Sequence, residues 1–188
     1  MPQYLAALMI VLLLGTVVGR VVLLRRTGTR AMYFGNLDNT DFLIPPLVLF
    51  YFYTLFATAF GWPLAITDRF FRSTAVAWLG VGLCLGGVLL LLFSLMSFGN
   101  SFRVGIDVEQ PGRLVTTGMF AVSRNPIYVG FFLFLLGQFL VFPSWTTLIA
   151  LAVASALFHR QVLREEEFMR QRYDQEYVEY CSRVRRYV

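Results

Sequence analysis

Two polar segments flank a long apolar stretch in the second half of the chain. The first is Arg124-Asn125-Pro126-Ile127-Tyr128-Val129-Gly130, and the second is Arg164-Glu165-Glu166-Glu167. Charged side chains are costly in or beside the hydrocarbon of a membrane. A chain that places arginine and glutamate at both ends of one apolar stretch is therefore predicted to use them, in a site at the membrane surface.

Simpler explanations exist for the first segment, and the residues alone leave them open. Arg124 at the end of a membrane span can anchor to phosphate headgroups. Asn125 is a good helix N-cap, and Pro126 fits the first turn of the helix that would follow. On this interpretation the segment only starts a helix and holds it at the surface.

The second segment, Glu165-Glu166-Glu167, is harder to explain as a simple flank, because a cytoplasmic flank would more cheaply be all basic. Glu165 and Glu166 are adjacent, so on a helix their side chains point about 100° apart and cannot both face one ligand squarely. Glu166 could instead pair with Arg170 at i+4, a surface contact worth only tenths of a kcal/mol. One carboxylate facing inward toward Asn125-Pro126 would account for the acidic run.

The elements that must position these residues are membrane helices. The chain is 57% hydrophobic and 14% charged, which is far more apolar than a soluble domain. A helix crosses the hydrocarbon core in about 20 residues, and the longest apolar stretch contains a turn at Phe142-Pro143-Ser144-Trp145. We expect an all-α polytopic membrane protein of about five spans, the last two a hairpin. The long apolar stretches are Leu5–Leu24, Phe42–Phe60, Val76–Phe98 and Ile127–Phe158.

The predicted organisation is a single membrane domain over residues 1–188. Residues 1–98 form a three-span scaffold, and residues 99–188 supply a cofactor-binding loop, the hairpin and the tail. Within the third span, Gly82 and Gly86 are expected to allow close helix packing, because no strand precedes them and their spacing is wrong for a dinucleotide loop.

The tail from Arg160 to Val184 has the pattern of an amphipathic cytoplasmic helix. Tyr173, Tyr177 and Tyr180 fall at i, i+4 and i+7, which places them on one stripe. Tyrosine suits the headgroup region, where its ring can be apolar and its hydroxyl hydrated. These tyrosines are therefore expected to lie at the membrane surface.

The distribution of arginine predicts the orientation. Arginines follow the first, third and fifth predicted spans, and only Arg69 and Arg72 lie on the other side. The positive-inside rule then places the N-terminus outside and the tail in the cytoplasm. The net charge of +5 comes entirely from arginines that flank spans, which predicts contact with anionic lipid headgroups and no nucleic acid. Arginine without lysine suggests a GC-rich genome, hence a bacterial inner membrane.

Metal and disulfide chemistry are not expected. Cys84 lies inside the third predicted span and Cys181 near the C-terminus, so the two form neither a disulfide framework nor a metal-ligand spacing. His159 is the only histidine.

In order and spacing, these motifs resemble the isoprenylcysteine carboxyl methyltransferase family, part of a wider set of membrane methyltransferases that includes phospholipid methyltransferases. The family pattern is Arg-His-Pro-x-Tyr-x-Gly-x-x-x-Trp, an apolar stretch, Glu-Glu, and a Phe-Gly and Tyr-x-x-Tyr tail. The likeness covers roughly Phe98 to Arg183, and the segments Gly99–Arg103 and Leu114–Phe120 also resemble the bacterial branch. The departures are Asn125 for His, Phe134 for Trp and Tyr173-Asp174 for Phe-Gly.

The resemblance implies S-adenosylmethionine as cofactor and a lipid-like or prenylated small acceptor. Arg124 would hold the cofactor carboxylate, and Glu165 or Glu166 would accept from its ammonium or ribose hydroxyls. If the acceptor is an amine, one of these glutamates would also take its proton. The cofactor-binding residues it implies are Arg124, Asn125, Pro126, Tyr128, Gly130, Glu165, Glu166 and Tyr177.

Two other functions remain open from the sequence. A membrane reductase that uses NADPH has a similar hairpin and tail, and Arg183, Arg185 and Arg186 could hold the 2′-phosphate. A non-catalytic membrane adaptor would use Arg124 and the glutamates only to pin the hairpin. Cofactor binding distinguishes the adaptor from the two enzymes, and the identity of the cofactor distinguishes the enzymes from each other.

Overall fold

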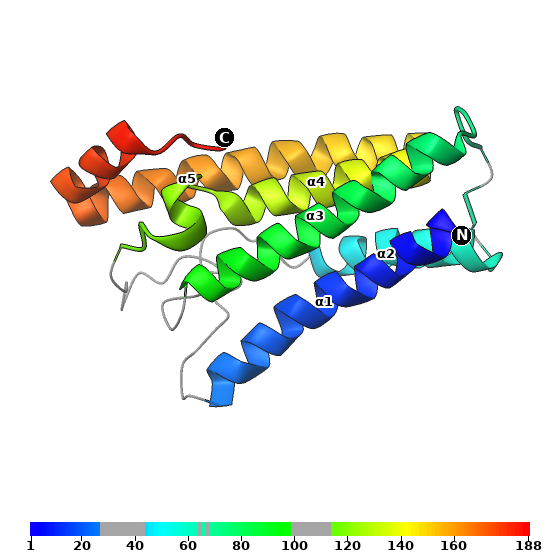
Figure 1. The fold of residues 1–188 in the computed structure, drawn as a ribbon, viewed down its shortest axis with the longest axis horizontal. Coiled ribbons are helices and arrows are strands. Elements are labelled where there is room, and N and C mark those ends of the chain that lie inside the picture. The colour runs from blue at the N-terminus through cyan, green and yellow to red at the C-terminus, as the bar shows by residue number, and fades with distance from the viewer. Residues whose placement is uncertain (27–43, 64, 67, 99–113) are drawn as a thin grey trace.

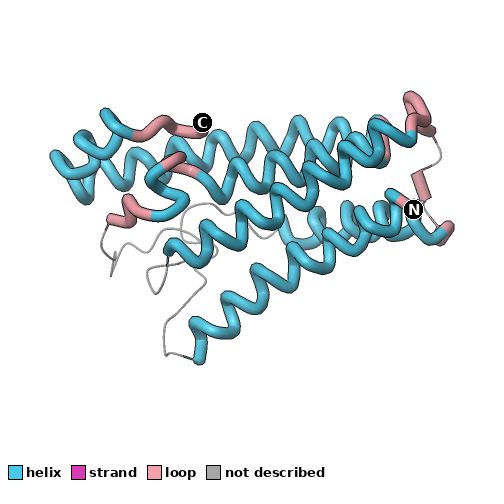
Figure 2. The backbone as a smooth tube through the Cα atoms, in the orientation of Figure 1, coloured by secondary structure: helices cyan, strands magenta, loops and turns pink. Residues whose placement is uncertain are grey.

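The computed structural model describes residues 1–26, 44–63, 65, 66, 68–98 and 114–188. These residues form helices joined by loops, with no strand in the described ranges, which confirms the all-α prediction (Figures 1 and 2). Residues 99–113 of the predicted cofactor-binding loop lie outside the described residues. In chain order the helices are α1 (Pro2–Arg26), α2 (Ile44–Phe60), α3 (Thr74–Phe98), the short 3-10 helix η3 (Gly118–Ala121), α4 (Pro126–Val141) and α5 (Trp145–Arg183).

Helix length separates the predicted spans into two groups. By length and composition, the described helices include three that can cross a membrane: Pro2–Leu23 of α1, α3 and α5. The other two are shorter, with 17 residues in α2 and 16 in α4. At 1.5 Å per residue α4 is about 24 Å long, less than the hydrocarbon core of about 30 Å.

The predicted turn between the last two helices is confirmed. Helix α4 ends at Val141, and Ser144 is the N-cap of α5. The Ser144 hydroxyl accepts from the backbone N–H of Thr147 at 3.3 Å, and Thr147 reaches back to the Ser144 backbone N–H in a capping box. The backbone N–H of Phe70 donates to Pro143 O at 2.8 Å, so the segment before α3 closes over the same turn.

Glycines bring α3 and α4 into close contact, but not the glycines expected from the sequence. A Cβ at Gly80 would lie 2.7 Å from Gly137 O, and one at Gly87 would lie 2.6 Å from Gly130 O. A Cβ at Gly82 would meet nothing within 4 Å, and the same holds at Gly86. The prediction for Gly82 and Gly86 is wrong, because residues seven apart, such as 80 and 87, share the face that α4 covers.

The tail does not form the predicted single helix with Tyr173, Tyr177 and Tyr180 on one face. Asp174 interrupts α5 with φ 40° and ψ −113°, and the chain then turns back over the end of the helix (Figure 1). The methyltransferase family pattern given above has glycine at this position, and glycine is the residue that tolerates positive φ. Tyr177 and Tyr180 are only 3% and 4% exposed, and the Tyr180 hydroxyl donates to Phe120 O at 2.6 Å. These two tyrosines therefore pack inside the protein rather than at a hydrated surface.

Candidate functional site

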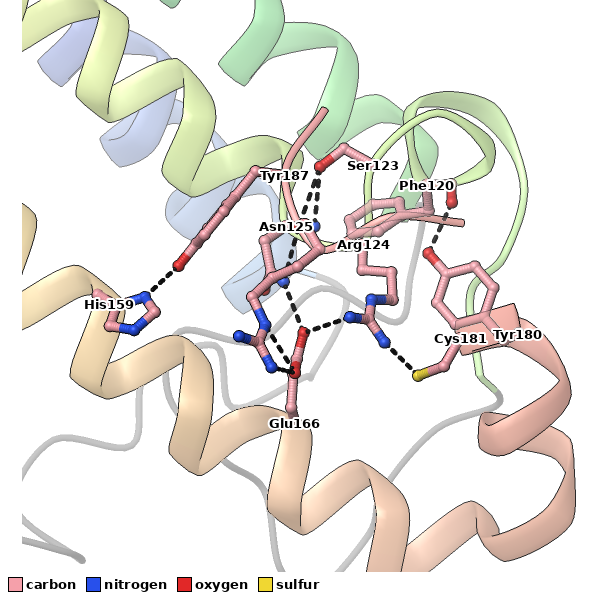
Figure 3. Close-up of polar contacts among 10 residues, drawn as sticks. Phe120, Ser123, Arg124, Asn125, His159, Glu166, Tyr180, Cys181 and Tyr187 are labelled. Atoms are coloured by element: carbon pink, nitrogen blue, oxygen red, sulfur yellow. Dashed lines mark hydrogen bonds and ion pairs between the residues drawn. The ribbon is translucent and has the colours of Figure 1, made fainter. Parts of the chain in front are cut away.

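Glu166 is the centre of the polar contacts at the mouth of the hairpin (Figure 3). Its side chain is buried, and its Oε1 accepts from Asn125 Nδ2 at 3.3 Å and lies 3.4 Å from Arg124 Nη2. Its Oε2 accepts from Arg186 Nε at 3.0 Å and Arg186 Nη2 at 2.9 Å. A carboxylate offers about four acceptor positions, so these donors fill its capacity. We call Arg124, Asn125, Glu166 and Arg186 the Glu166 cluster.

Asn125 occupies the N-cap position of α4 without capping it. Pro126 begins the helix as predicted, but the Asn125 side chain makes no cap hydrogen bond. Instead its Nδ2 donates to Glu166 and to the backbone carbonyl of Arg186 at 3.1 Å. Its backbone N–H donates to the Ser123 hydroxyl at 3.1 Å, which holds it in place. The capping explanation is therefore wrong for this side chain, which joins the site to the C-terminus.

Arg124 is held at two of its nitrogens, but one of the partners is a poor acceptor. Nη2 pairs with Glu166, whereas Nη1 contacts Cys181 Sγ, and a thiol accepts hydrogen bonds only weakly. Its Nε is buried and has no hydrogen-bond partner within the described structure. Within the described residues, Arg124 thus has an unpaired N–H at Nε and only a weak acceptor at Nη1.

The last five residues, 184–188, run back across the hairpin mouth in a segment that we call the C-terminal strap. The backbone N–H of Arg124 donates to Arg185 O at 3.0 Å, and the Ser123 hydroxyl donates to Arg186 O at 3.4 Å. The Tyr187 hydroxyl lies 2.7 Å from His159 Nδ1 on α5. The hydrogen bond to Glu166 raises the pKa of the Arg186 guanidinium, a group that is positively charged at neutral pH in any case.

Glu165 forms a second, separate polar group one turn further into the hairpin. Its Oε1 accepts from the Tyr128 hydroxyl at 2.7 Å and from Gln161 Nε2 at 3.1 Å. The Tyr128 ring packs beside Phe158, with centroids 5.7 Å apart. Glu165 is half-buried, and both of these hydrogen bonds fall on one oxygen. We call Tyr128, Gln161 and Glu165 the Glu165 cluster.

The predicted site residues thus divide between two clusters, with some outside both. Arg124, Asn125 and Glu166 come together, and Tyr128 meets Glu165. Tyr177 is buried one turn before the thiol that contacts Arg124, and Pro126 is buried at the start of α4. Gly130 faces α3, and a Cβ there would lie 3.0 Å from Gly87 O, so helix packing is enough to explain this glycine. Its predicted part in cofactor binding stays a prediction.

Several residues that complete the site do not follow from the sequence pattern: Ser123, His159, Cys181, Arg186 and Tyr187. Arg186, which the sequence offers as a cation for a 2′-phosphate, lies against Glu166 instead. No periodicity signals these contacts, because they depend on the reversal at Asp174. Among the described residues, no group of three or more His, Cys, Asp or Glu side chains could hold a metal ion.

Comparisons with known proteins give the family. The phospholipid methyltransferase family model matches residues 75–176, more than half of the chain. Protein-S-isoprenylcysteine O-methyltransferase B of Arabidopsis thaliana is 30% identical over 108 residues, which cover 56% of this chain and 55% of that protein. Protein-S-isoprenylcysteine O-methyltransferase of Saccharomyces cerevisiae is 28% identical over 149 residues, covering 77% and 54%. The namesake from Tribolium castaneum is 27% identical over 139 residues, covering 70% and 50%.

The chain spans about half the length of the curated relatives it matches. No solved structure matches the chain significantly. The matched residues 75–176 include nearly all of α3, all of α4, α5 as far as Glu176, and the glutamates of the two clusters. They agree with the resemblance stated from the motifs alone. The chain belongs to the phospholipid methyltransferase family.

Proposed function

We propose that this protein transfers a methyl group from S-adenosylmethionine to a lipid-like or prenylated small acceptor at the cytoplasmic face of a membrane. The observation that carries the proposal is the convergence of Arg124, Asn125 and Glu166 at the mouth of an apolar hairpin. The curated relatives named above are isoprenylcysteine O-methyltransferases, which supports the same chemistry. The acceptor atom, a carboxylate oxygen or an amine nitrogen, is left open.

The side chains of the site fit this cofactor. S-adenosylmethionine supplies an electrophilic methyl group, so the protein need only bind, align and exclude water. Arg124 would hold the amino acid carboxylate, because its Nη1 now faces only a thiol. Glu165 would accept from the ammonium or a ribose hydroxyl, because its hydrogen bonds occupy one oxygen. Tyr128 orients that carboxylate.

Proton handling depends on the acceptor. A carboxylate acceptor is already a nucleophile and needs no base. An amine acceptor must lose a proton, and Glu165 is the better candidate to take it, since Glu166 is saturated by two arginines and an amide. Glu166 then has a positional rather than a proton-transfer role.

The membrane setting completes the proposal. The start of α1 lies at the end of the bundle opposite to the hairpin mouth (Figure 1). With the positive-inside rule, this supports an N-terminus outside and a site on the cytoplasmic side of the membrane. We propose that this membrane is a bacterial inner membrane, since the chain has arginine and no lysine. Anionic headgroups would contact the arginines around the site. The contacts of Arg186 do not favour the NADPH alternative, because this arginine is paired with Glu166 and is not free to hold a 2′-phosphate.

The test is isothermal titration of the detergent-purified protein with S-adenosylhomocysteine, and with NADPH in parallel. We expect the first to bind and the second not to. Arg124→Ala should lose binding, whereas Arg170→Ala should keep it, because Arg170 is exposed and pairs with Glu167 on the surface at 3.9 Å. Binding of NADPH alone would favour the reductase. Binding of neither by a folded protein would favour the adaptor.

A further inference from the structure

We infer that the C-terminal strap is part of the cofactor site and that Arg186 is a positioning residue, which holds Glu166 and through it Arg124. The inference rests on the proposed function and extends it to residues 184–188. These residues lie beyond the segment 75–176 that the family model matches.

The first step is that the strap is tied to the hairpin mouth by both backbone and side chains. Arg185 O accepts from the Arg124 backbone N–H, and Arg186 O accepts from the Asn125 amide and the Ser123 hydroxyl. The donors are three consecutive residues, 123–125, immediately before α4. The strap therefore fixes the same short segment that carries Arg124 and Asn125.

The second step is the way in which Arg186 holds Glu166. Its Nε and Nη2 both donate to Oε2, which leaves Oε1 to Arg124 and Asn125. One carboxylate oxygen thus serves the strap and the other serves the hairpin mouth. Without Arg186, Oε2 would lose both of these donors in a buried position, and the carboxylate would rotate toward water or toward another donor.

The third step connects this arrangement to Arg124. The Arg124 guanidinium has one strong partner, the Oε1 of Glu166, and one weak partner, the Cys181 thiol. If the Glu166 carboxylate rotates, its ion pair with Arg124 is lost, and the Arg124 guanidinium is no longer held in one orientation. Arg186 itself has a side chain 39% exposed, so it reaches the cluster from the solvent side. Its role is to orient the residues that bind the cofactor, not to bind the cofactor itself.

The test compares two arginines in the full-length protein in detergent. Arg186→Gln removes the donor pair to Glu166, whereas Arg183→Gln removes the same charge from an exposed side chain that donates to Glu179 O on its own helix. By titration with S-adenosylhomocysteine, we expect Arg186→Gln to weaken binding about tenfold or more and Arg183→Gln to leave it unchanged. Arg186→Lys should restore binding only in part, because lysine lacks the planar fork.

A double variant separates positioning from general stability. In a Glu166→Gln background, Arg186→Gln should weaken binding little further, because its partner carboxylate is already gone. Equal binding by wild type and Arg186→Gln, or full additivity in the double variant, would overturn the role of Arg186. A lowered melting temperature of Arg186→Gln with unchanged affinity would show a purely structural contact and would also overturn it.

A measurement on the unmodified protein covers the case in which Arg186→Gln fails to fold. Val188 is 80% exposed, so carboxypeptidase can begin on the strap. Saturating S-adenosylhomocysteine should slow the release of residues 186–188 several-fold if the strap belongs to the site. Equal release rates with a ligand shown to bind would overturn the inference alone. Failure of wild type to bind the ligand would overturn the proposed function, and this inference with it.

Discussion

Glu165 and Glu166 are neighbours on α5, yet they lie in different environments. Glu166 is buried and joins three segments, the hairpin mouth, α5 and the strap. Glu165 is half-buried, and among the described residues its side chain accepts hydrogen bonds from Tyr128 on α4 and from Gln161 on its own helix. The helical rotation of about 100° per residue sends adjacent side chains to different neighbours. We therefore propose different roles for the two glutamates: Glu166 holds the structure of the site, and Glu165 contacts the ligand.

Removing the Glu166 carboxylate should have the largest effect. Glu166→Ala would leave Arg124 and Arg186 without their shared partner, and breaking a buried ion pair in this way costs roughly 3–5 kcal/mol. Because Arg186 is partly exposed, we expect about 2–4 kcal/mol of lost stability, measured by denaturation in micelles. Glu165→Ala is the control and should cost about 1 kcal/mol. Equal losses of stability in the two variants would contradict the proposal that Glu166 has the structural role and Glu165 does not.

Glu165→Gln should show the opposite signature. A charge-assisted hydrogen bond to the cofactor contributes roughly 1.5–3 kcal/mol, so affinity for S-adenosylhomocysteine should fall by that amount. The melting temperature should change little, because Gln keeps an oxygen that accepts from Tyr128 and Gln161. Unchanged affinity would show that Glu165 does not contact the ligand, and would contradict the different roles proposed for Glu165 and Glu166.

The α3–α4 interface tests whether both clusters depend on helix placement. A Cβ at Gly137 would lie 2.5 Å from Gly80 O, so Gly137→Ala should force α3 and α4 apart and destabilise by about 1–3 kcal/mol. Because α4 begins at Pro126 and carries Tyr128, both clusters should loosen together. Gly82→Ala has open space and is the matched control, expected to be neutral or stabilising by up to about 1 kcal/mol. Similar thermal shifts for both variants would argue against this packing.

The smallest effect should come from Asp174, and it should be a gain. Its φ of 40° is unfavourable for a residue with a Cβ, so Asp174→Gly should stabilise the fold by about 1 kcal/mol. Asp174→Ala removes the same carboxylate but keeps the Cβ, and should give no gain. Only the Glu166 cluster depends on this reversal, so carboxypeptidase release of the strap should slow in Asp174→Gly. A stabilised alanine variant would show that the carboxylate, not the backbone, is unfavourable.

The outline of the fold could be predicted from the sequence, because hydrophobic length and breaker residues act locally. The apolar stretches became helices, and Pro143-Ser144 marked the turn between α4 and α5. The prediction that one carboxylate faces Asn125 also agrees with the structure, since Glu166 accepts from it. Helix length was less predictable, because α2 and α4 are shorter than full spans. Which face of a helix packs against which neighbour could not be predicted: in α3 it is Gly80 and Gly87 that contact α4, and not Gly82 and Gly86.

From residue types and their spacing, one can predict that this chain forms apolar helices, places arginine and glutamate at the hairpin mouth, and carries the motifs of its family. Those properties depend on residue type and on spacing along one helix. Three contacts follow from the three-dimensional arrangement instead: Arg186 reaches Glu166, Asn125 holds the strap instead of capping α4, and Gly80 and Gly87 meet α4. These contacts join residues from 20 to 61 positions apart, or two different helices. They depend on a backbone reversal at Asp174 and on helix rotation, which no local pattern specifies.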